Sequence, residues 1–275
     1  MSDKNHTITI FIHATLPLGP FLNIPLVKKY AWCPLGLNSL ASIKEDFYLA
    51  SMAMILCDQD PELFNKEFFY LFGWSGRLSM KERRKAAQEL SQALSELTRQ
   101  SASQGISISF RIITHSHGGN VALHLAEFFT DTPPFTIDEL ILLACPVQKK
   151  TELYVAHPLF RTVWSIHSHI DVIQRMDPQG LYSFLESLHS TGLEFTLSHL
   201  RTLGPLFSLR HFTPSPNLRQ LHVKYPSRDL FHIEFILGDF IRSLPALIRY
   251  MNDDQPSEKH SHQEITYIIP PITKT

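Results

Sequence analysis

The segment Thr114-His115-Ser116-His117-Gly118-Gly119 lies between two apolar stretches of different periodicity. The residues before it, 106–113, alternate and then become wholly apolar, which is typical of a buried strand in a parallel sheet. The residues after it, 120–129, carry apolar side chains at helical spacing. A helix that follows a strand so closely requires a sharp turn, and two glycines allow the helix to approach the sheet. The segment therefore predicts a strand, a tight turn at Ser116 and a helix.

A serine held in such a turn is presented at the edge of the sheet and can act as a nucleophile. The usual pattern is Gly-x-Ser-x-Gly, and here Thr114 replaces the first glycine. Threonine is larger and β-branched, so we expect a slightly opened turn. The alternative is an ordinary serine in a loop between a strand and a helix. A similar pattern, Gly73-Trp74-Ser75-Gly76, has Arg77 where the second small residue is needed, so we interpret Ser75 as a turn residue.

The rest of the chain alternates between strand and helix patterns. Strands are predicted at 7–12, 68–72, 140–144, 162–167 and 218–223, a long helix after a capping box from Ser79 to Glu82, and a last helix that begins near Asp229 and contains Pro245. This alternation predicts an α/β fold with a mostly parallel central sheet and helices on both faces.

We expect one domain over residues 1–250, followed by a polar C-terminal tail over 251–275 in which 265–269 has the composition of a short edge strand. Two apolar, proline-containing segments, 16–61 and 178–217, do not fit the repeat. They are either cap or lid excursions over the site or long excursions packed on the body of the domain.

Charge and composition exclude several classes of protein. The chain has 25 basic and 26 acidic residues, a balance that gives no basic field for nucleic acid. Its three cysteines are far apart and odd in number, which favours reduced core thiols over disulfides. No stretch is long enough for a transmembrane span, and the apolar run 7–13 is too short for a signal peptide. We expect a cytoplasmic enzyme, and export by another signal and peripheral membrane contact stay open.

No cofactor or metal is expected. The chain has no dinucleotide-binding or phosphate-binding glycine motif. His-Ser-His occurs at 115–117, 167–169 and 260–262, and on a strand this spacing puts both rings on one face. No cysteine or acidic cluster supplies further ligands at a recognisable spacing. The basic clusters Lys28-Lys29 and Arg83-Arg84-Lys85 are interpreted as solvated faces.

The chain resembles the α/β-hydrolase superfamily, in its serine esterase and lipase branch. The similarity covers the order of elements from about residue 7 to residue 250, and the segment around Ser116 is its specific motif. In that family the nucleophile, the acid and the histidine follow one another in the chain, the acid after a late strand and the histidine after the last. The resemblance implies a triad of Ser116, Asp171 and His232, with Asp177 as the competing acid.

The resemblance also implies two backbone N–H donors that stabilise an oxyanion. One belongs to the residue after the nucleophile, His117. The other belongs to the loop after the first strand, where the family often has His-Gly and this chain has His13-Ala14, so Ala14 or Thr15 is the expected donor.

The implied function is hydrolysis of carboxylic esters through an acyl-enzyme on Ser116, with a small-molecule ester or lipid as the binding partner. Apolar residues in the two excursions favour lipid or other apolar acyl esters: Phe21, Leu22, Leu26, Tyr30, Trp32, Leu181, Tyr182, Phe184, Leu185, Phe195 and Phe207. The alternatives are a non-catalytic binding or interaction protein with this fold, an acyltransferase or a thioesterase. The sequence carries no signal for an oligomeric state.

Overall fold

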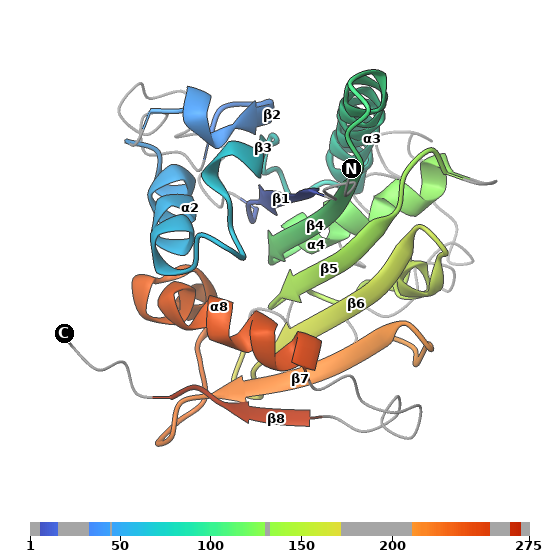
Figure 1. Ribbon diagram of the computed structural model, residues 1–275. Coiled ribbons are helices and arrows are strands. Elements are labelled where there is room, and N and C mark those ends of the chain that lie inside the picture. Colours follow the sequence, from blue (N-terminus) through green and yellow to red (C-terminus); the bar gives the residue numbers. More distant parts are fainter. Residues whose placement is uncertain are drawn as a thin grey trace, which may run out of the picture.

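The computed structural model describes residues 6–15, 33–44, 46–129, 133–171, 211–253 and 265–270. These residues form an eight-stranded sheet in the order β2-β3-β1-β4-β5-β6-β7-β8 (Figure 1). The strands are β1 His6–Ile12, β2 Gly36–Ser39, β3 Phe69–Gly73, β4 Ile108–His115, β5 Ile137–Leu143, β6 Phe160–His167, β7 Leu218–Lys224 and β8 Ile265–Ile268. Neighbouring strands are parallel except for β2, which runs antiparallel to β3 at one edge. The predicted α/β class and mostly parallel sheet are confirmed.

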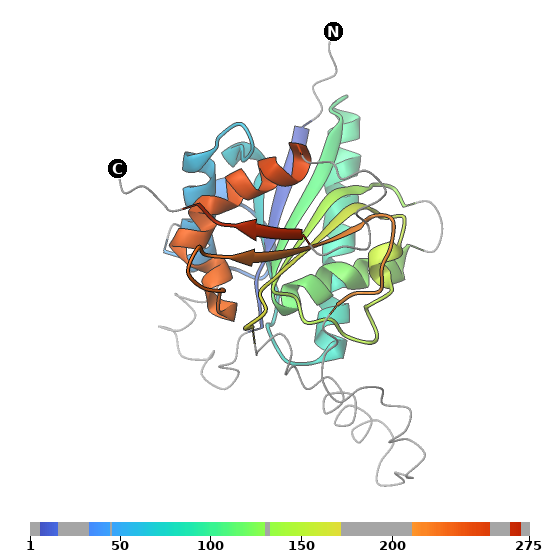
Figure 2. The same ribbon diagram turned by 90° about the horizontal axis from the view of Figure 1, so that it is seen from below.

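Helices cover both faces of this sheet (Figure 2). Helices α2 Tyr48–Gln59 and α8 Gly238–Asp253 pack on one face, and α3 Met80–Ser103 and α4 His117–Leu123 on the other. Short 3-10 helices connect the elements: η2 Leu40–Ser42, η3 Lys66–Phe68, η4 His124–Phe128, η5 Tyr154–Ala156 and η6 His232–Ile236. The sheet is therefore the middle layer of three.

The central strands bury side chains on both faces, as their apolar sequences predict. In β1, Ile8, Ile10 and Ile12 pack in the cluster that contains α3 and α4, whereas Phe11 packs in the cluster that contains α2 and α8. This division follows from the period of two in a strand, which points successive side chains to opposite faces. Two separate apolar cores therefore hold the sheet between its helices.

Part of the first predicted excursion belongs to the body of the domain. The segment 33–61 contains β2, which pairs with β3, and α2, which packs against α8 in one of the two cores. Residues 16–32 and 178–210, where all the apolar residues attributed to an acyl pocket lie, are outside the described residues. A cap over the site therefore stays a prediction for residues 16–32 and 178–210.

The sheet extends beyond residue 250. Helix α8 contains the buried Pro245 and runs to Asp253, and residues 265–268 of the predicted tail form β8, which pairs with β7. The long helix α3 begins where the sequence places it, and the Ser79 side chain accepts a hydrogen bond from the Glu82 N–H at 3.3 Å. No helix within the described ranges is long and apolar enough to cross a membrane.

The three cysteines all lie in the interior. Cys33, Cys57 and Cys145 are buried thiols. Burial raises the pKa of Cys33 to about 12 and, with a contribution from the charge of Asp58, the pKa of Cys57 to about 11. Thiols with such high pKa values are poor nucleophiles, since the thiolate is the reactive form.

Candidate active site

The turn at Ser116 has a strained backbone. It joins the last residue of β4 directly to the first residue of α4, with φ 52° and ψ −130° at Ser116. Among the described non-glycine residues, only Ala144 also has a positive φ. The Ser116 N–H donates to the Leu143 carbonyl at 2.8 Å, and the Gly119 N–H donates to the Ser116 carbonyl at 2.9 Å. Such strain costs about 1–3 kcal/mol and is concentrated at functional sites.

The residues flanking the turn explain how it closes. A Cβ on Gly118 would lie 2.6 Å from the His13 carbonyl oxygen, and one on Gly119 would lie 2.5 Å from Cys145 Sγ, so only glycine fits at either position. Thr114 is still within β4, fully buried, and its hydroxyl donates to the Ile141 carbonyl at 3.2 Å. A β-branched residue suits that strand position. Threonine is thus accommodated by the sheet, and the unusual backbone falls on Ser116.

The predicted acid and histidine lie together at the carboxyl ends of two neighbouring strands. Asp171 follows β6 and is buried, and His232 follows β7 as the first residue of η6. His232 Nδ1 lies 2.8 Å from Asp171 Oδ2. A carboxylate accepts a hydrogen bond from Nδ1–H, which leaves the lone pair of Nε2 to act as a base. The competing acid, Asp177, lies outside the described residues.

His115 connects the serine turn to His232. Its Nε2–H donates to the His232 carbonyl at 3.1 Å, and the two imidazole rings lie 4.9 Å apart. Burial and the charge of His232 lower the pKa of His115 to about 3. His115 is therefore neutral, and this bond places the residue before Ser116 against the backbone of His232. In the sequence, His115 stands out only as part of the repeated His-Ser-His motif.

The loop after β1 lies against the start of α4. This follows from the close approach of Gly118 to the His13 carbonyl. The predicted donors therefore come from neighbouring elements, since His117 is the first residue of α4 and Ala14 and Thr15 follow His13. The Thr15 hydroxyl is buried and has no hydrogen-bond partner among the described residues.

Trp74 and His13 hold this loop in place. The Trp74 backbone N–H donates to His13 Nε2 at 3.0 Å, and the indole N–H donates to the His13 carbonyl at 2.9 Å. His13 Nδ1–H in turn donates to the Ala14 carbonyl at 2.6 Å. Burial lowers the pKa of His13 to about 4, so the ring stays neutral with its proton on Nδ1. These bonds orient the backbone at Ala14.

A buried arginine lies beside the turn, which corrects one prediction. Arg83 is fully buried and not part of a solvated face; its neighbours Arg84 and Lys85 are exposed. Arg83 Nη1 lies 2.5 Å from His117 Nδ1, and Arg83 Nε–H donates to the Ser79 carbonyl at 3.3 Å. Because a guanidinium has no acceptor, His117 Nδ1 accepts and its proton is on Nε2.

The burial of Arg83 had a signal in the sequence. It precedes Ala87, Leu90 and Leu94 at helical spacing, and all three are buried positions of α3. The run of basic residues at 83–85 led to a wrong prediction for Arg83, because the position of a residue on the helix face decides whether it is buried. The result is a cation in the interior that contacts His117, the residue after Ser116.

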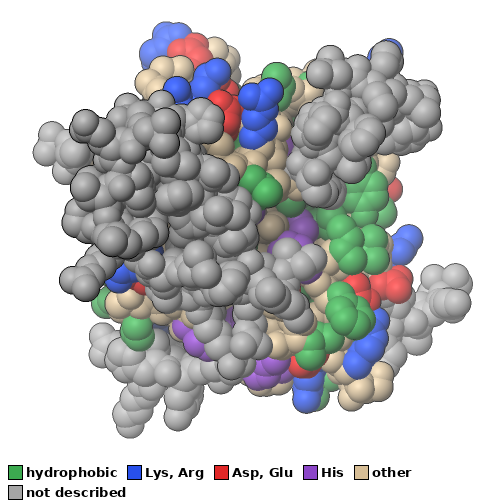
Figure 3. Space-filling model, turned by 180° about the vertical axis from the view of Figure 1, so that it is seen from behind, with side chains coloured by type: hydrophobic (Ala, Val, Ile, Leu, Met, Phe, Trp, Pro, Cys, Tyr) green, Lys and Arg blue, Asp and Glu red, His purple; other side chains and the backbone are tan. Residues whose placement is uncertain are grey.

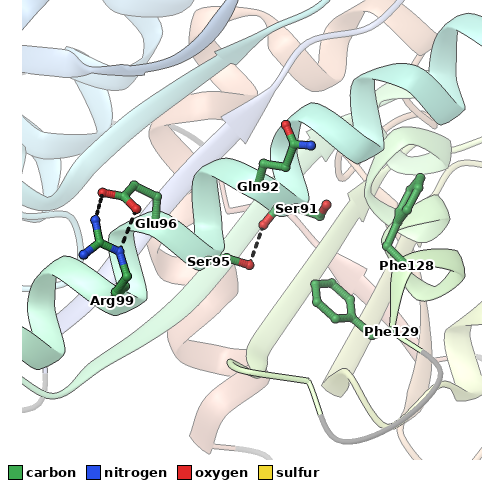
Figure 4. A pocket seen from close by; sticks show the side chains of 7 residues that line it. All are labelled: Ser91, Gln92, Ser95, Glu96, Arg99, Phe128 and Phe129. Carbon is green, nitrogen blue, oxygen red and sulfur yellow. Dashed lines mark hydrogen bonds and ion pairs between the residues drawn. The ribbon is translucent and has the colours of Figure 1, made fainter.

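A groove of about 330 Å³ lies elsewhere on the molecule (Figure 4). It is formed between α3 and the aromatic residues after α4, and its lining residues are Ser91, Gln92, Ser95, Glu96, Arg99, Phe128 and Phe129. None of these is a predicted site residue, and Arg99 is neutralised by Glu96 at 2.6 Å. We assign this groove no role in the chemistry.

No protein-family model matches this chain, and no curated protein is significantly similar to it in sequence. Among solved structures it is similar to that of a "putative thioesterase" from Silicibacter sp. TM1040, with 11% sequence identity and a TM-score of 0.30. The match covers 96% of this chain and 68% of the other. A likeness at this level carries no information about the chemistry of the site.

Proposed function

We propose that this chain is a serine hydrolase of the α/β-hydrolase superfamily that cleaves carboxylic esters. Ser116 is the nucleophile, His232 the general base and Asp171 the acid that orients it. The observation that supports this most directly is the 2.8 Å contact between His232 and Asp171, two residues 61 positions apart. They meet at the ends of parallel strands whose sheet also carries the strained serine turn.

In the first half of the reaction, Ser116 Oγ attacks the ester carbonyl carbon while His232 Nε2 takes the hydroxyl proton. The tetrahedral intermediate then collapses, its bond to the alcohol oxygen breaks, and His232 returns the proton to the leaving alcohol. The product of this half is an acyl-enzyme on Ser116. In the second half, His232 Nε2 removes a proton from a water molecule as the water oxygen attacks the acyl carbonyl carbon. The bond from that carbon to Ser116 Oγ then breaks and His232 returns the proton to Oγ, which releases the carboxylic acid and restores the serine hydroxyl.

Asp171 stabilises the imidazolium that forms at His232 in each half of the reaction. The residue is buried, and a buried carboxylate is costly unless a partner is present. Its partner here is the ring that becomes cationic in the reaction. This arrangement argues against a purely non-catalytic role, which requires no such pair.

The oxyanion of the tetrahedral intermediate is stabilised by the backbone N–H of His117 and by that of Ala14 or Thr15. The bonds from Trp74 and His13 orient the second of these groups, and the Arg83 guanidinium lies against the His117 ring. Removal of one donor of this kind from an enzyme typically costs about 10²–10³ in kcat. The oxyanion site is thus organised by residues that follow β1 and β3 and by one residue of α3.

The substrate class is a lipid or another apolar acyl ester, by the composition of the segments 16–61 and 178–217. A thioesterase and an acyltransferase form the same acyl-enzyme and differ only in the leaving group or in the final acceptor. A chain-length series of nitrophenyl esters separates a lipase from a short-chain esterase, and a flat profile contradicts the apolar acyl preference. Product analysis with added alcohols detects transfer.

Labelling with a fluorophosphonate probe tests the nucleophile. We expect the purified wild type to be labelled and Ser116→Ala to be unlabelled. Ser75→Ala is the matched control, since Ser75 also stands in a short glycine-flanked turn after a parallel strand, and we expect it to be labelled like the wild type. The proposal is wrong if the wild type is not labelled or if Ser116→Ala is labelled equally.

A further inference from the structure

Three side chains with metal-binding atoms meet at the ends of β6 and β7. His169 lies in the loop after β6, His222 in β7, and Asp229 in the loop after β7. One ligand atom from each lies within 4.8 Å of those from the other two. Within the described residues, no other group of histidine, cysteine, aspartate and glutamate side chains has this arrangement.

His222 is in contact with both of the other residues. The rings of His169 and His222 stack with centroids 3.7 Å apart and an angle of 4° between their planes. His222 Nε2 lies 3.1 Å from Asp229 Oδ1. His222 is buried, whereas His169 and Asp229 are half-buried, so an ion could reach them from solvent.

Further histidines and a hydroxyl surround this group. His167 is the register partner of His222 across β6 and β7, and the ring of His211 lies 5.4 Å from that of His167. On the other side, the Thr266 hydroxyl of β8 lies 3.5 Å from His222 Nδ1. Partners of this kind on the second ring nitrogen orient a metal-binding histidine. Histidine side chains reach the surface at several points of the face seen in Figure 3.

We propose that His169, His222 and Asp229 bind one divalent transition-metal ion of the zinc type. Imidazole nitrogen and carboxylate oxygen are ligands that Zn²⁺ prefers, and bonds of about 2.0–2.2 Å hold such atoms roughly 3.4 Å apart in a tetrahedron. The ligand atoms now lie within 4.8 Å of one another, so binding requires them to close by up to about 1.4 Å. The stacked rings of His169 and His222 must also tilt away from parallel, because the lone pair of a coordinating nitrogen lies in the plane of its ring. The carboxylate neutralises part of the ion's charge.

The sequence predicts no metal site because these ligands do not lie at short spacing along the chain. His169 and His222 are 53 positions apart, and the parallel pairing of β6 with β7 brings them together. The spacing of two residues along the chain gives neither the distance between their side chains nor the direction from one to the other.

The ion would join the two loops that carry the proposed acid and histidine. His169 precedes Asp171 by two residues, and Asp229 precedes His232 by three. We infer that the bound ion positions the pair Asp171 and His232, and this consequence rests on the function proposed above. The proposal that the ion binds does not rest on that function, because none of its three ligands belongs to the triad.

Metal binding by the untagged full chain tests the site. After treatment with a chelator, we expect titration calorimetry to show one equivalent of Zn²⁺ bound, and Co²⁺ to give visible absorption bands of a tetrahedral complex. Zn²⁺ should also raise the Tm. His169→Asn and Asp229→Asn should each weaken Zn²⁺ binding about tenfold or more and remove the rise in Tm. Both replaced side chains are half-buried, so the variants are expected to fold.

The third His-Ser-His segment provides the matched control. The double variant His260→Asn/His262→Asn removes two histidines from the chain and should bind Zn²⁺ as the wild type does. The proposal is overturned if the wild type binds no Zn²⁺, or if the His260/His262 variant loses binding while His169→Asn and Asp229→Asn retain it.

A second measurement separates the site from its effect on catalysis. Fluorophosphonate labelling of Ser116 should be slower in the metal-free protein and recover on addition of Zn²⁺. If Zn²⁺ binds but labelling does not change, the positioning role is wrong and the metal site stands. If neither form is labelled, the hydrolase proposal fails and the binding data still decide the site.

Discussion

Two serine turns follow two parallel strands of the same sheet, and they are built differently. After β4, helix α4 begins immediately, and the positive φ falls on Ser116 itself. After β3, helix α3 begins only at Met80, and the positive φ falls on Gly76, with Ser75 before it. Both turns have a serine near a glycine, so their local residue types are alike. They differ in the number of residues between the serine and the next helix.

This difference assigns the turns different roles. Where the helix starts at once, the serine takes the strained conformation and stands beside the first N–H groups of the helix. Where several residues intervene, a glycine takes the positive φ without strain, and the turn is free to support something else. It supports the loop after β1 through the two hydrogen bonds from Trp74 to His13.

The largest expected effect comes from replacing Asp171, the partner of His232, for which the Ser75 turn has no proposed counterpart. Asp171→Asn should lower kcat for a reactive ester by about 10⁴, because an amide cannot hold the His232 tautomer or stabilise its cation. Steady-state kinetics with the purified variants measure this. Asp177→Asn, the competing acid, should keep most of the activity; the reverse ranking of the two variants would reassign the acid.

Steric crowding at the first turn should have the next largest effect. Gly118→Ala puts a Cβ 2.6 Å from the His13 carbonyl oxygen, so α4 must shift away from the loop after β1. A displacement of about 1 Å in such a site can cost about 10² in rate. Gly76→Ala, at φ 63° in the second turn, should cost about 1 kcal/mol of stability and leave kcat unchanged. Equal activity losses would contradict the comparison.

Acid should destabilise the support that the second turn provides. The pKa of His13 is lowered to about 4 in the folded state from 6.5, so its contribution to stability is complete above pH 6.5 and is lost as the pH falls toward 4. The loss is about 1.4 kcal/mol per pH unit, or about 2 kcal/mol by pH 5.

Urea unfolding of the wild type and His13→Gln at pH 7, 6 and 5 measures this term. Gln does not titrate and can still accept from the Trp74 N–H, so the variant should lose stability less steeply with acid. Parallel slopes for the two proteins would show that His13 does not carry the dependence.

The smallest expected effect is loss of a single support bond. Trp74→Phe removes the indole N–H that donates to the His13 carbonyl and should cost about 1 kcal/mol of stability and less than tenfold in kcat. Trp164→Phe changes a buried tryptophan of the other core and should leave kcat unaffected. Thermal unfolding and kinetics of both variants decide whether the second turn acts on the site.

Much of the fold could be predicted from local patterns. The strands β1, β3, β5, β6 and β7 lie within a few residues of the predicted ranges, because alternating or continuous apolar runs reflect burial directly. The unit of β4, turn and α4 was predicted for the same reason. The helix after the turn is shorter than the predicted range, since it becomes 3-10 at His124.

The candidate site was only partly accessible to the same reasoning. Asp171 and His232 were proposed through a family resemblance in chain order, and the structure brings their side chains together. The burial of Arg83 was missed because the local charge run was followed instead of its helical spacing with the buried positions of α3. The link from His115 to His232 was missed because it depends on which surface packs against His115.

The sequence by itself therefore determined the alternation of strands and helices and the sharp turn at Ser116, since both follow from side-chain periodicity and from glycine's lack of a Cβ. Only the tertiary structure decided which distant side chains meet. It joined Asp171 to His232, stacked His169 on His222 and set Trp74 against His13. Parallel strands place their carboxyl ends at one edge whatever their separation along the chain, so these contacts leave no trace in local spacing.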